Sequence, residues 1–158
     1  MRIVILGGGF GGVNAALWLG KRLENREHEV LLISNQSTFL FRPSLIWVPF
    51  GGREMENITY PLNEILQKAG VKLVVDKVVQ LRPKEKHVVL QKNANLDYDF
   101  LVVATGGFPD YGKIEGLEGE TSSIYFSDQA LQTKEQIEKI QSGDSIVIGV
   151  AAGNPNSS

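Results

Sequence analysis

The sequence contains no cysteine among its 158 residues, and it has only two histidines and two methionines. Without cysteine the chain forms no disulfide, and it offers no thiolate metal ligand and no thiol redox centre. The two histidines, His28 and His87, stand far apart, so we expect no metal site. No apolar run approaches the about 20 residues that a membrane-spanning helix requires.

A large excess of charge of one sign is also missing, since 16 basic and 18 acidic residues leave a net charge of -2. This balance gives no reason to expect a nucleic-acid partner. A hydrophobic content of 42% fits one soluble globular unit, or one domain and the start of another. The first residue leads directly into an apolar run, so we expect no signal peptide and a cytoplasmic protein.

The most informative stretch is an apolar run, Ile3 to Leu6, that leads into a glycine cluster. Gly7, Gly9 and Gly12 follow the spacing G-x-G-x-x-G. In a strand–turn–helix unit the first glycine allows the turn, the second lets a pyrophosphate approach, and the third lets the helix pack closely. The helix N-terminus adds free N–H groups and a positive dipole end. The strand before the turn and the helix after it favour a dinucleotide site over an empty glycine turn.

Substitutions at this turn provide a test. We expect valine at Gly9 to obstruct a pyrophosphate and to disturb the backbone. Alanine at Gly8, outside the motif, should be milder if the backbone angles of Gly8 are ordinary.

A helix after the glycines and a second strand, Val30 to Ile33, complete a βαβ unit. Dinucleotide sites usually place Asp or Glu at the end of this strand, where the carboxylate binds the ribose. Here Ser34 and Asn35 occupy that place, and neither forms a charge-assisted hydrogen bond. No arginine follows directly to bind the 2′-phosphate of NADP. The missing carboxylate therefore argues against NAD as the ligand of this N-terminal βαβ unit.

Residues 36–53 are rich in aromatic side chains and contain two prolines. Such a segment can form the wall of a pocket for a flat ring, or it can be a packed loop or interdomain surface, and the pattern leaves both open. Pro61 is placed for the first turn of a helix that ends at Gly70. Residues 71–75 then predict a third parallel strand.

The second half of the chain continues the same architecture. Short apolar runs at 78–79, 87–90 and 100–103 predict an antiparallel meander, and the last run ends, as a buried strand, in a second glycine turn. Ser127 is a suitable N-cap for a later helix, and residues 145–153 predict another strand and turn. The fold class is therefore α/β. We expect a Rossmann-like domain with a parallel sheet and a meander over residues 1–112. An interdomain crossing and the first elements of a truncated second dinucleotide-binding domain follow over 113–158.

Two stretches together resemble flavoproteins with two dinucleotide-binding domains. These include type II NADH dehydrogenases, sulfide:quinone oxidoreductases, ferredoxin reductases and pyridine-nucleotide disulfide oxidoreductases. Residues 3–17 resemble the FAD-pyrophosphate motif of these proteins. Residues 98–106 resemble their Ala-Thr-Gly motif, which closes the FAD domain.

The resemblance implies FAD as cofactor and a set of binding residues. By this resemblance, the pyrophosphate contacts Gly7, Gly9, Phe10, Gly11 and Gly12, and the FAD phosphates also lie near Ala104, Thr105 and Gly106. The ribose contacts Ser34 and Asn35, and the adenine contacts Val78. The isoalloxazine ring lies along Arg42, Pro43 and Ser44. It assigns no catalytic residue to this chain. The family's C-terminal flavin motif and membrane-binding tail lie outside the chain. We therefore expect the fragment alone to be inactive and to bind FAD weakly or not at all.

The resemblance also ranks the possible reactions. The disulfide-reductase branch needs a cysteine pair near residues 39–50, which is missing. The pattern F-x-F-x-P-S, followed by Trp47 and Val48, is most similar to sulfide:quinone oxidoreductases. The incomplete glycine turn at 149–153 favours sulfide or another sulfur species over NADH as electron donor. The resemblance implies a quinone or another small molecule as the electron acceptor. It also implies that the full-length protein, but not this chain alone, associates peripherally with the cytoplasmic membrane.

One departure keeps other reactions open. The cysteines that act on sulfide in that branch would align near Tyr125 and Asn156, and this chain has no cysteine at either position. A type II NADH:quinone dehydrogenase or a ferredoxin-type reductase remains the alternative. A nicotinamide-dependent dehydrogenase with one Rossmann domain and a non-catalytic nucleotide-binding module are the competing classes.

Overall fold

The computed structural model describes residues 1–23 and 27–149. The chain opens with the predicted βαβ unit, formed by β1 (Arg2–Leu6), α1 (Phe10–Arg22) and β2 (Glu29–Ser34). The buried face of α1 is made of small residues and one valine. A Cβ added at Gly20 would lie 2.2 Å from the carbonyl oxygen of Ala69. A glycine in the last turn of this helix is therefore explained by close packing against Ala69 and Val71, which precede the strand at Lys72–Val75.

The central sheet has four parallel strands in the order β5-β2-β1-β9, with β5 at Lys72–Val75 and β9 at Phe100–Val103. Ile5 lies opposite Leu32 on one side and Val102 on the other. Because all four strands run the same way, their carboxyl ends lie along one edge of the sheet. The chain leaves β1 toward β2 and returns on the other side of β1 as β9, which makes this edge a topological switch point.

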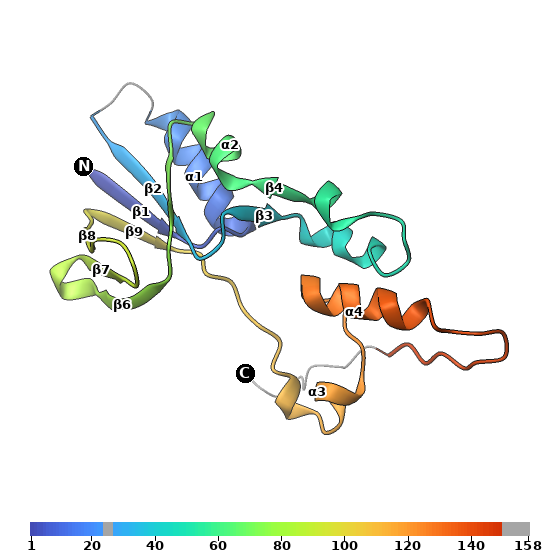
Figure 1. Ribbon diagram of the computed structural model, residues 1–158. Coiled ribbons are helices and arrows are strands. Elements are labelled where there is room, and N and C mark those ends of the chain that lie inside the picture. The colour runs from blue at the N-terminus through green and yellow to red at the C-terminus, as the bar shows by residue number, and fades with distance from the viewer. Residues whose placement is uncertain (24–26, 150–158) are drawn as a thin grey trace.

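Both faces of this sheet are covered (Figure 1). Helices α1 and α2 (Leu62–Gln67) cover one face. A three-stranded antiparallel sheet covers the other face and consists of β6 (Val78–Arg82), β7 (His87–Leu90) and β8 (Leu96–Asp97). Alternate residues of β1 point to the two sides, with Ile5 in the helix-side core and Val4 against the meander. Burial on both faces explains why β1 and β2 are continuous aliphatic runs.

The run at 100–103 does not belong to the meander, and this prediction was wrong. It forms β9, which pairs parallel with β1, and the two-residue strand β8 takes the third place in the meander. β9 is also not buried, since Phe100 and Val103 are each 59% exposed. In the part of the chain that the structure describes, β9 is an edge strand without a neighbour on its outer side.

Two predicted helix starts are shifted by one residue. Pro61 is the N-cap of α2 and ends β4 (Thr59–Pro61) instead of beginning the helix. At the other end, α2 stops at Gln67, before the predicted stop at Gly70, which has φ +66°. Ser127 is the first residue of α4 (Ser127–Ile137), and Phe126 is its N-cap. Shifts of this size are usual at helix ends.

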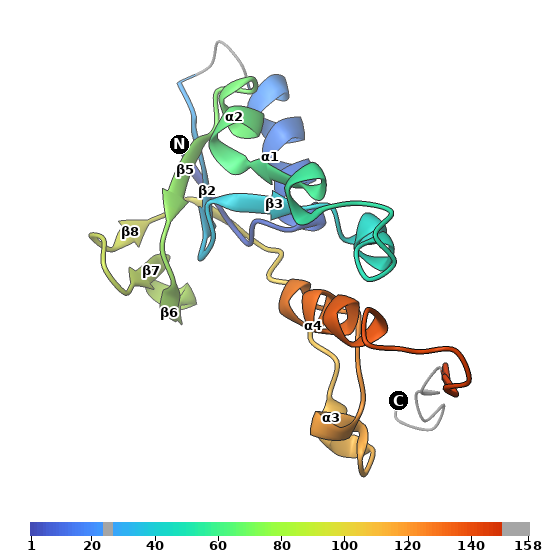
Figure 2. The ribbon, with the colours of Figure 1, turned by 45° about the vertical axis from the view of Figure 1, so that its right-hand side comes forward.

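Residues 38–61 form an arm that projects from the end of the parallel sheet (Figures 1 and 2). The arm begins and ends with the antiparallel pair β3 (Thr38–Leu40) and β4, and between them lie the 3₁₀ helices η1 (Arg42–Trp47) and η2 (Met55–Ile58). Ala130 of α4 packs against this arm in one apolar cluster with Leu45, Val48 and Ile58. Lys134 of α4 also pairs with Glu54, with 3.1 Å between Nζ and Oε2.

The remaining short helices are η3 (Pro83–Glu85), η4 (Tyr111–Lys113) and α3 (Leu117–Glu120). The predicted strand at 145–153 is not formed in its described part, residues 145–149. Val147 is 93% exposed there, and none of the described strands pairs with this segment. Residues 150–153 of that prediction lie outside the described residues. The domain boundary after residue 112 and the truncated second domain stay predictions.

Candidate functional site

The two glycine turns, far apart in the sequence, meet at the carboxyl edge of the parallel sheet. The N–H of Ala104 donates to the carbonyl of Leu6 at 2.8 Å, and the N–H of Gly7 donates to the carbonyl of Ile33 at 2.8 Å. A Cβ at Gly7 would lie 2.2 Å from the oxygen of Ala104, and Gly7 has φ +112°. Both the backbone angle and the contact between the turns therefore require glycine at this position.

The other two motif glycines differ sharply in their surroundings. A Cβ at Gly12 would lie 1.8 Å from the carbonyl oxygen of Gly7, so this glycine is required by packing. Gly9 is the N-cap of α1 and has φ −86° and ψ −170°, angles that any residue adopts. A Cβ at Gly9 would have no atom within 4 Å. No described protein atom explains a glycine at this position, which borders the open space in front of the helix.

Gly8 does not behave as the sequence predicted. Its φ is not positive, but a Cβ there would lie 2.5 Å from Oγ of Ser34 and 2.9 Å from Cδ1 of Leu62. Alanine at Gly8 therefore disturbs the contact between the glycine turn, β2 and α2. The predicted order of severity for the fold is reversed, because Gly9 has space for a side chain and Gly8 has none.

The first turn of α1 is suited to an anion. No side chain caps its N–H groups, and no acidic residue lies in its first turn. Uncapped N–H groups and the positive end of the helix dipole stabilise a phosphate at this place. The ring of Phe10 packs edge-on against Phe39, with 5.0 Å between ring centroids, and lies tilted against Phe41, with 5.5 Å between centroids. Phe10 therefore ties the start of α1 to the arm, while the predicted role of Phe10 and Gly11 in phosphate binding rests on their N–H groups.

At the end of β2, the two residues predicted to contact the ribose differ in their exposure. Asn35 is exposed, whereas Ser34 is 5% exposed and its Oγ accepts the N–H of Gln36 at 3.1 Å. Of the two side chains, Asn35 is the accessible one.

Asp76, a residue that no sequence motif predicted, organises the neighbouring loop. Its carboxylate accepts hydrogen bonds from the N–H groups of Lys77 (2.7 Å), Lys92 (3.0 Å) and Asn93 (2.7 Å) and from Nδ2 of Asn93 (2.7 Å). Burial by itself would raise the pKa of Asp76, but these donors outweigh it and lower the pKa to about 2. The N–H of Asp76 also donates to the carbonyl of Ser34 at 2.8 Å. A carboxylate directly after a parallel strand was the available signal.

The anchored loop leads to Val78, the residue predicted to face the adenine. Val78 is half-buried against the meander-side core, and its backbone pairs with Leu90. Its contact with an adenine stays a prediction.

The Asp76 hydrogen bonds predict a specific dependence of stability on pH. Since the folded pKa of about 2 lies below the ordinary 3.8, ionised Asp76 stabilises the fold above pH 3.8, and this contribution is lost as the pH falls toward 2. We expect Asp76→Asn to melt at a lower temperature than the parent at neutral pH, with the difference shrinking between pH 3.8 and 2. Thermal melts across this pH range measure the difference in melting temperature between the two proteins. A difference that does not change with pH would contradict a stabilising role for ionised Asp76.

The residues predicted along the isoalloxazine lie at the start of η1 in the arm. The guanidinium carbon of Arg42 lies 5.1 Å from the ring centroid of Tyr125 and 5.8 Å from that of Phe126. Ser44 is 3% exposed, and its Oγ accepts a hydrogen bond from Arg53. Pro43 is exposed. Arg42 thus joins the arm to the segment before α4, by cation–π contacts that the sequence did not reveal.

The structure thus brings most of the predicted residues to one edge of the sheet (Figure 2). The residues at the ends of β1, β2 and β9 lie along that edge: Gly7, Gly9, Phe10, Gly11, Gly12, Ser34, Asn35, Ala104, Thr105 and Gly106. Thr105 and Gly106 are exposed, and Ala104 is half-buried. Val78 follows the end of β5, and the Arg42–Ser44 group lies beyond β3. Among the described residues no cluster of His, Asp and Glu could hold a metal.

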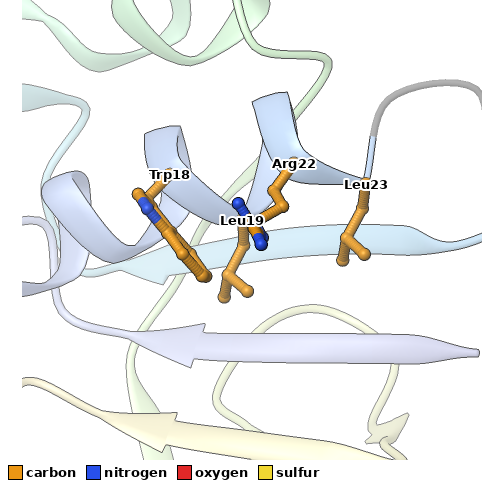
Figure 3. Close-up of a pocket in the computed structure, with 4 residues that line it drawn as sticks. All are labelled: Trp18, Leu19, Arg22 and Leu23. Atoms are coloured by element: carbon orange, nitrogen blue, oxygen red, sulfur yellow. The ribbon is translucent and has the colours of Figure 1, made fainter.

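A surface groove lies elsewhere, along α1, where four side chains extend from the helix over the strands of the parallel sheet (Figure 3). It is lined by Trp18, Leu19, Arg22 and Leu23, with the Arg22 guanidinium carbon 5.3 Å from the Trp18 ring centroid. None of these residues is a predicted cofactor contact. The candidate site is therefore the carboxyl edge of the sheet, and this groove is separate from it. In residues 1–23 and 27–149 no helix is both long and apolar enough for a transmembrane segment.

Comparison with known proteins finds relatives that are named as quinone reductases. A sulfide-quinone reductase of Aquifex aeolicus is 30% identical over 152 residues, which cover 96% of this chain and 35% of that protein. The external NADH-ubiquinone oxidoreductase 2 of Saccharomyces cerevisiae is 30% identical over 131 residues, covering 77% of this chain and 23% of that protein. This chain thus spans about a third or less of the length of these relatives.

Solved structures agree with the sequence comparison. The crystal structure of the sulfide:quinone oxidoreductase from Aquifex aeolicus matches with a TM-score of 0.76 and 31% identity, over 87% of this chain and 31% of that one. The structure of NDH2 from Plasmodium falciparum matches with a TM-score of 0.71 at 23% identity, over 85% of this chain and 28% of that one, and at this identity it shows the fold alone. The family model described as pyridine nucleotide-disulphide oxidoreductase matches residues 1–152. Fold, motif geometry and family match agree, and the chain belongs to the pyridine nucleotide-disulphide oxidoreductase family.

Proposed function

We propose that this chain is the FAD-binding part of a flavin-dependent oxidoreductase that passes electrons from a small reductant to a quinone. The observation that carries the proposal is the geometry of Gly9. It combines ordinary backbone angles with a Cβ position open to at least 4 Å, beside a helix N-terminus that no side chain caps. A diphosphate fits there, because its oxygens need both the space and the N–H donors.

The neighbouring residues complete a site that suits an FAD dinucleotide. Asn35 offers an exposed amide at the ribose end, and the turn at Thr105 and Gly106 lies beside the glycine motif. Pro43 lies farther along, in the arm, on the side assigned to the isoalloxazine. The chemistry that FAD supplies when bound is two-electron transfer between a donor and an acceptor. The role of this chain's residues is to bind and orient the cofactor.

For the donor we propose sulfide or a related sulfur species. The resemblance of residues 39–48 and the similarity to sulfide-quinone reductases support this choice. NADH is the second candidate, supported by the similarity to NADH-ubiquinone oxidoreductases. Tyr125 stands where a sulfide-reactive cysteine would align, and its ring packs on Arg42. Asn156, the other such position, lies outside the described residues.

Anaerobic mixing of the intact FAD-loaded protein with each donor distinguishes the candidates. We expect the flavin absorption to bleach rapidly with sulfide and slowly with NADH, and a quinone to restore it. Bleaching by NADH alone would reverse the assignment of the donor. A bound flavin that no donor reduces would favour a non-catalytic nucleotide-binding module.

A further inference from the structure

Asp76 is a buried carboxylate whose charge is held by uncharged donors. It is 5% exposed and follows β5 directly, at the carboxyl edge of the parallel sheet. Its donors are the main-chain N–H groups of Lys77, Lys92 and Asn93 and the side-chain amide of Asn93. None of the ion pairs formed within residues 1–23 and 27–149 involves Asp76. A carboxylate that binds mostly main-chain groups fixes the course of the backbone, and it does so with charge-assisted hydrogen bonds.

The hydrogen bonds of Asp76 join three segments of the chain. The N–H of Asp76 donates to the carbonyl of Ser34, at the end of β2, at 2.8 Å. Its Oδ1 accepts the N–H of Lys77 at 2.7 Å, in the segment that connects β5 to β6. Its Oδ2 accepts the N–H groups of Lys92 and Asn93, in the turn after β7. Asp76 therefore ties the strand that carries the predicted ribose contacts to the segment that leads to the predicted adenine contact.

Val78 depends on this anchor, because the strand pairing that follows it is irregular. Val78 pairs with Leu90, but the register between β6 and β7 shifts between Val78 and Gln80. A regular ladder would support Val78 from both sides, and a shift of this kind interrupts the support on its C-terminal side. On its N-terminal side, Val78 is positioned by Lys77, whose N–H is bound by Asp76.

Adenine is a base that a fixed main chain can distinguish. Its edge presents an acceptor at N1 beside an amino donor at C6, whereas hypoxanthine presents an N1–H donor beside a carbonyl at C6. A main-chain N–H and C=O that match adenine therefore meet two mismatched groups in hypoxanthine. Such a site discriminates because the wrong base leaves polar groups unpaired, and it does so only if its own groups are held in place.

We propose that Asp76 is a positioning residue that holds the main chain of Lys77 and Val78 where it selects adenine over hypoxanthine. Asp76 acts through these two residues and is assigned no contact with the cofactor. The proposal rests on the proposed function, since it takes FAD as the ligand and Val78 as the adenine contact. It adds to that function the residue that sets the selectivity for the base.

Asparagine at Asp76 tests the proposal with the smallest change of shape. An amide has one oxygen, which keeps most donors when it takes the place of Oδ2, where three hydrogen bonds converge. Its NH2 group then faces the N–H of Lys77, and that hydrogen bond is lost. The turn at residues 92–93 stays anchored, while the segment before Val78 is released. Asp97→Asn is the matched control, because Asp97 lies in the same antiparallel sheet with its side chain 80% exposed.

The readout is the ratio of the dissociation constants for IDP and ADP, measured by competition with FAD in the intact protein. The two nucleotides differ only in the base, so a general loss of stability weakens both alike and leaves the ratio unchanged. We expect the parent to bind ADP about tenfold more tightly than IDP, and Asp76→Asn to bring the ratio to about one by weakening ADP binding. Asp97→Asn should keep the ratio of the parent. Asn93→Ala, which removes one donor and keeps the carboxylate, should lower the ratio by less than Asp76→Asn does.

Hydrogen exchange of the flavin-free protein, followed by NMR, adds a measurement that needs no ligand. We expect the amides of Lys77 and Val78 to exchange faster in Asp76→Asn than in the parent, and those of β1 to exchange at the same rate. Circular dichroism shows that each variant is folded at the temperature used.

The outcomes separate this proposal from the proposed function. A folded Asp76→Asn protein that keeps the preference for ADP, or that exchanges these amides at the rate of the parent, would overturn this proposal alone. A parent that binds FAD but does not distinguish ADP from IDP would also overturn it alone. A parent that binds neither FAD nor ADP would overturn the proposed function, and this proposal with it.

Discussion

Valine in place of Gly9 is expected to weaken FAD binding strongly without unfolding the protein. The Cβ position of Gly9 is open and its angles are ordinary, so the folded chain accommodates the side chain. The branched side chain would occupy the space in front of α1, where the pyrophosphate is assigned, and would separate it from the N–H groups. We expect the dissociation constant for FAD to rise at least about a hundredfold, or roughly 2.8 kcal/mol. Flavin fluorescence titration of the intact protein measures it, with circular dichroism as the check of folding.

Two other glycine substitutions make this result interpretable. Gly112→Val is the matched control, because a Cβ there makes only an ordinary contact of 3.8 Å with Asp110, and Gly112 lies outside the motif. It should leave both FAD binding and the fold unchanged. Gly8→Ala should lower the melting temperature, since its Cβ would lie 2.5 Å from Ser34 Oγ. Parent-like FAD affinity in a folded Gly9→Val protein would place the pyrophosphate elsewhere.

Alanine at Gly12 is expected to have the largest effect on stability. Its Cβ would lie 1.8 Å from the carbonyl oxygen of Gly7, and the helix and the turn would have to separate. Overpacking of this kind costs about 1–3 kcal/mol and occasionally more, and a contact with backbone belongs at the upper end. We expect the free energy of unfolding to fall by about 3 kcal/mol, as measured by urea denaturation.

Gly11→Ala is the control for this substitution, one residue earlier in the same helix. A Cβ at Gly11 would lie 3.5 Å from Cβ of Ala104, an ordinary contact. Alanine is favoured over glycine inside a helix by about 1 kcal/mol, so this variant should be as stable as the parent or more stable. Equal stability of the Gly11→Ala and Gly12→Ala proteins would contradict the packing described for the motif.

The sequence predicted the elements whose pattern is local. The βαβ unit and the glycine turn that follows β1 were predicted because strand periodicity, glycine spacing and helix periodicity agree over a short stretch. The pairing of β9 was not predicted correctly. Four apolar residues suit a meander and a parallel sheet equally, and their partner β1 is distant in the sequence, since Phe100 pairs with Ile3.

For the site residues, too, local patterns could be predicted from the sequence, and contacts between distant segments could not. The glycine motif is a local pattern, and its three glycines differ in the structure: Gly7 has a positive φ, Gly12 has a close backbone contact, and Gly9 has open space around its Cβ position. The burial of Ser34, the anchoring of Asp76 by Asn93 and the stacking of Arg42 on Tyr125 depend on contacts between distant segments. No spacing rule in one sequence reports such contacts. The family resemblance located the Arg42 region, but only the fold revealed what its guanidinium contacts.

Titration of the intact parent protein with FAD tests whether the glycine turns bind this cofactor. We expect FAD to bind in a one-to-one complex with flavin absorption bands, and we expect Gly9→Val to weaken this binding strongly while Gly112→Val retains it. A folded intact protein that shows no flavin bands, even with FAD in excess, would contradict the assignment of the glycine turns to this cofactor.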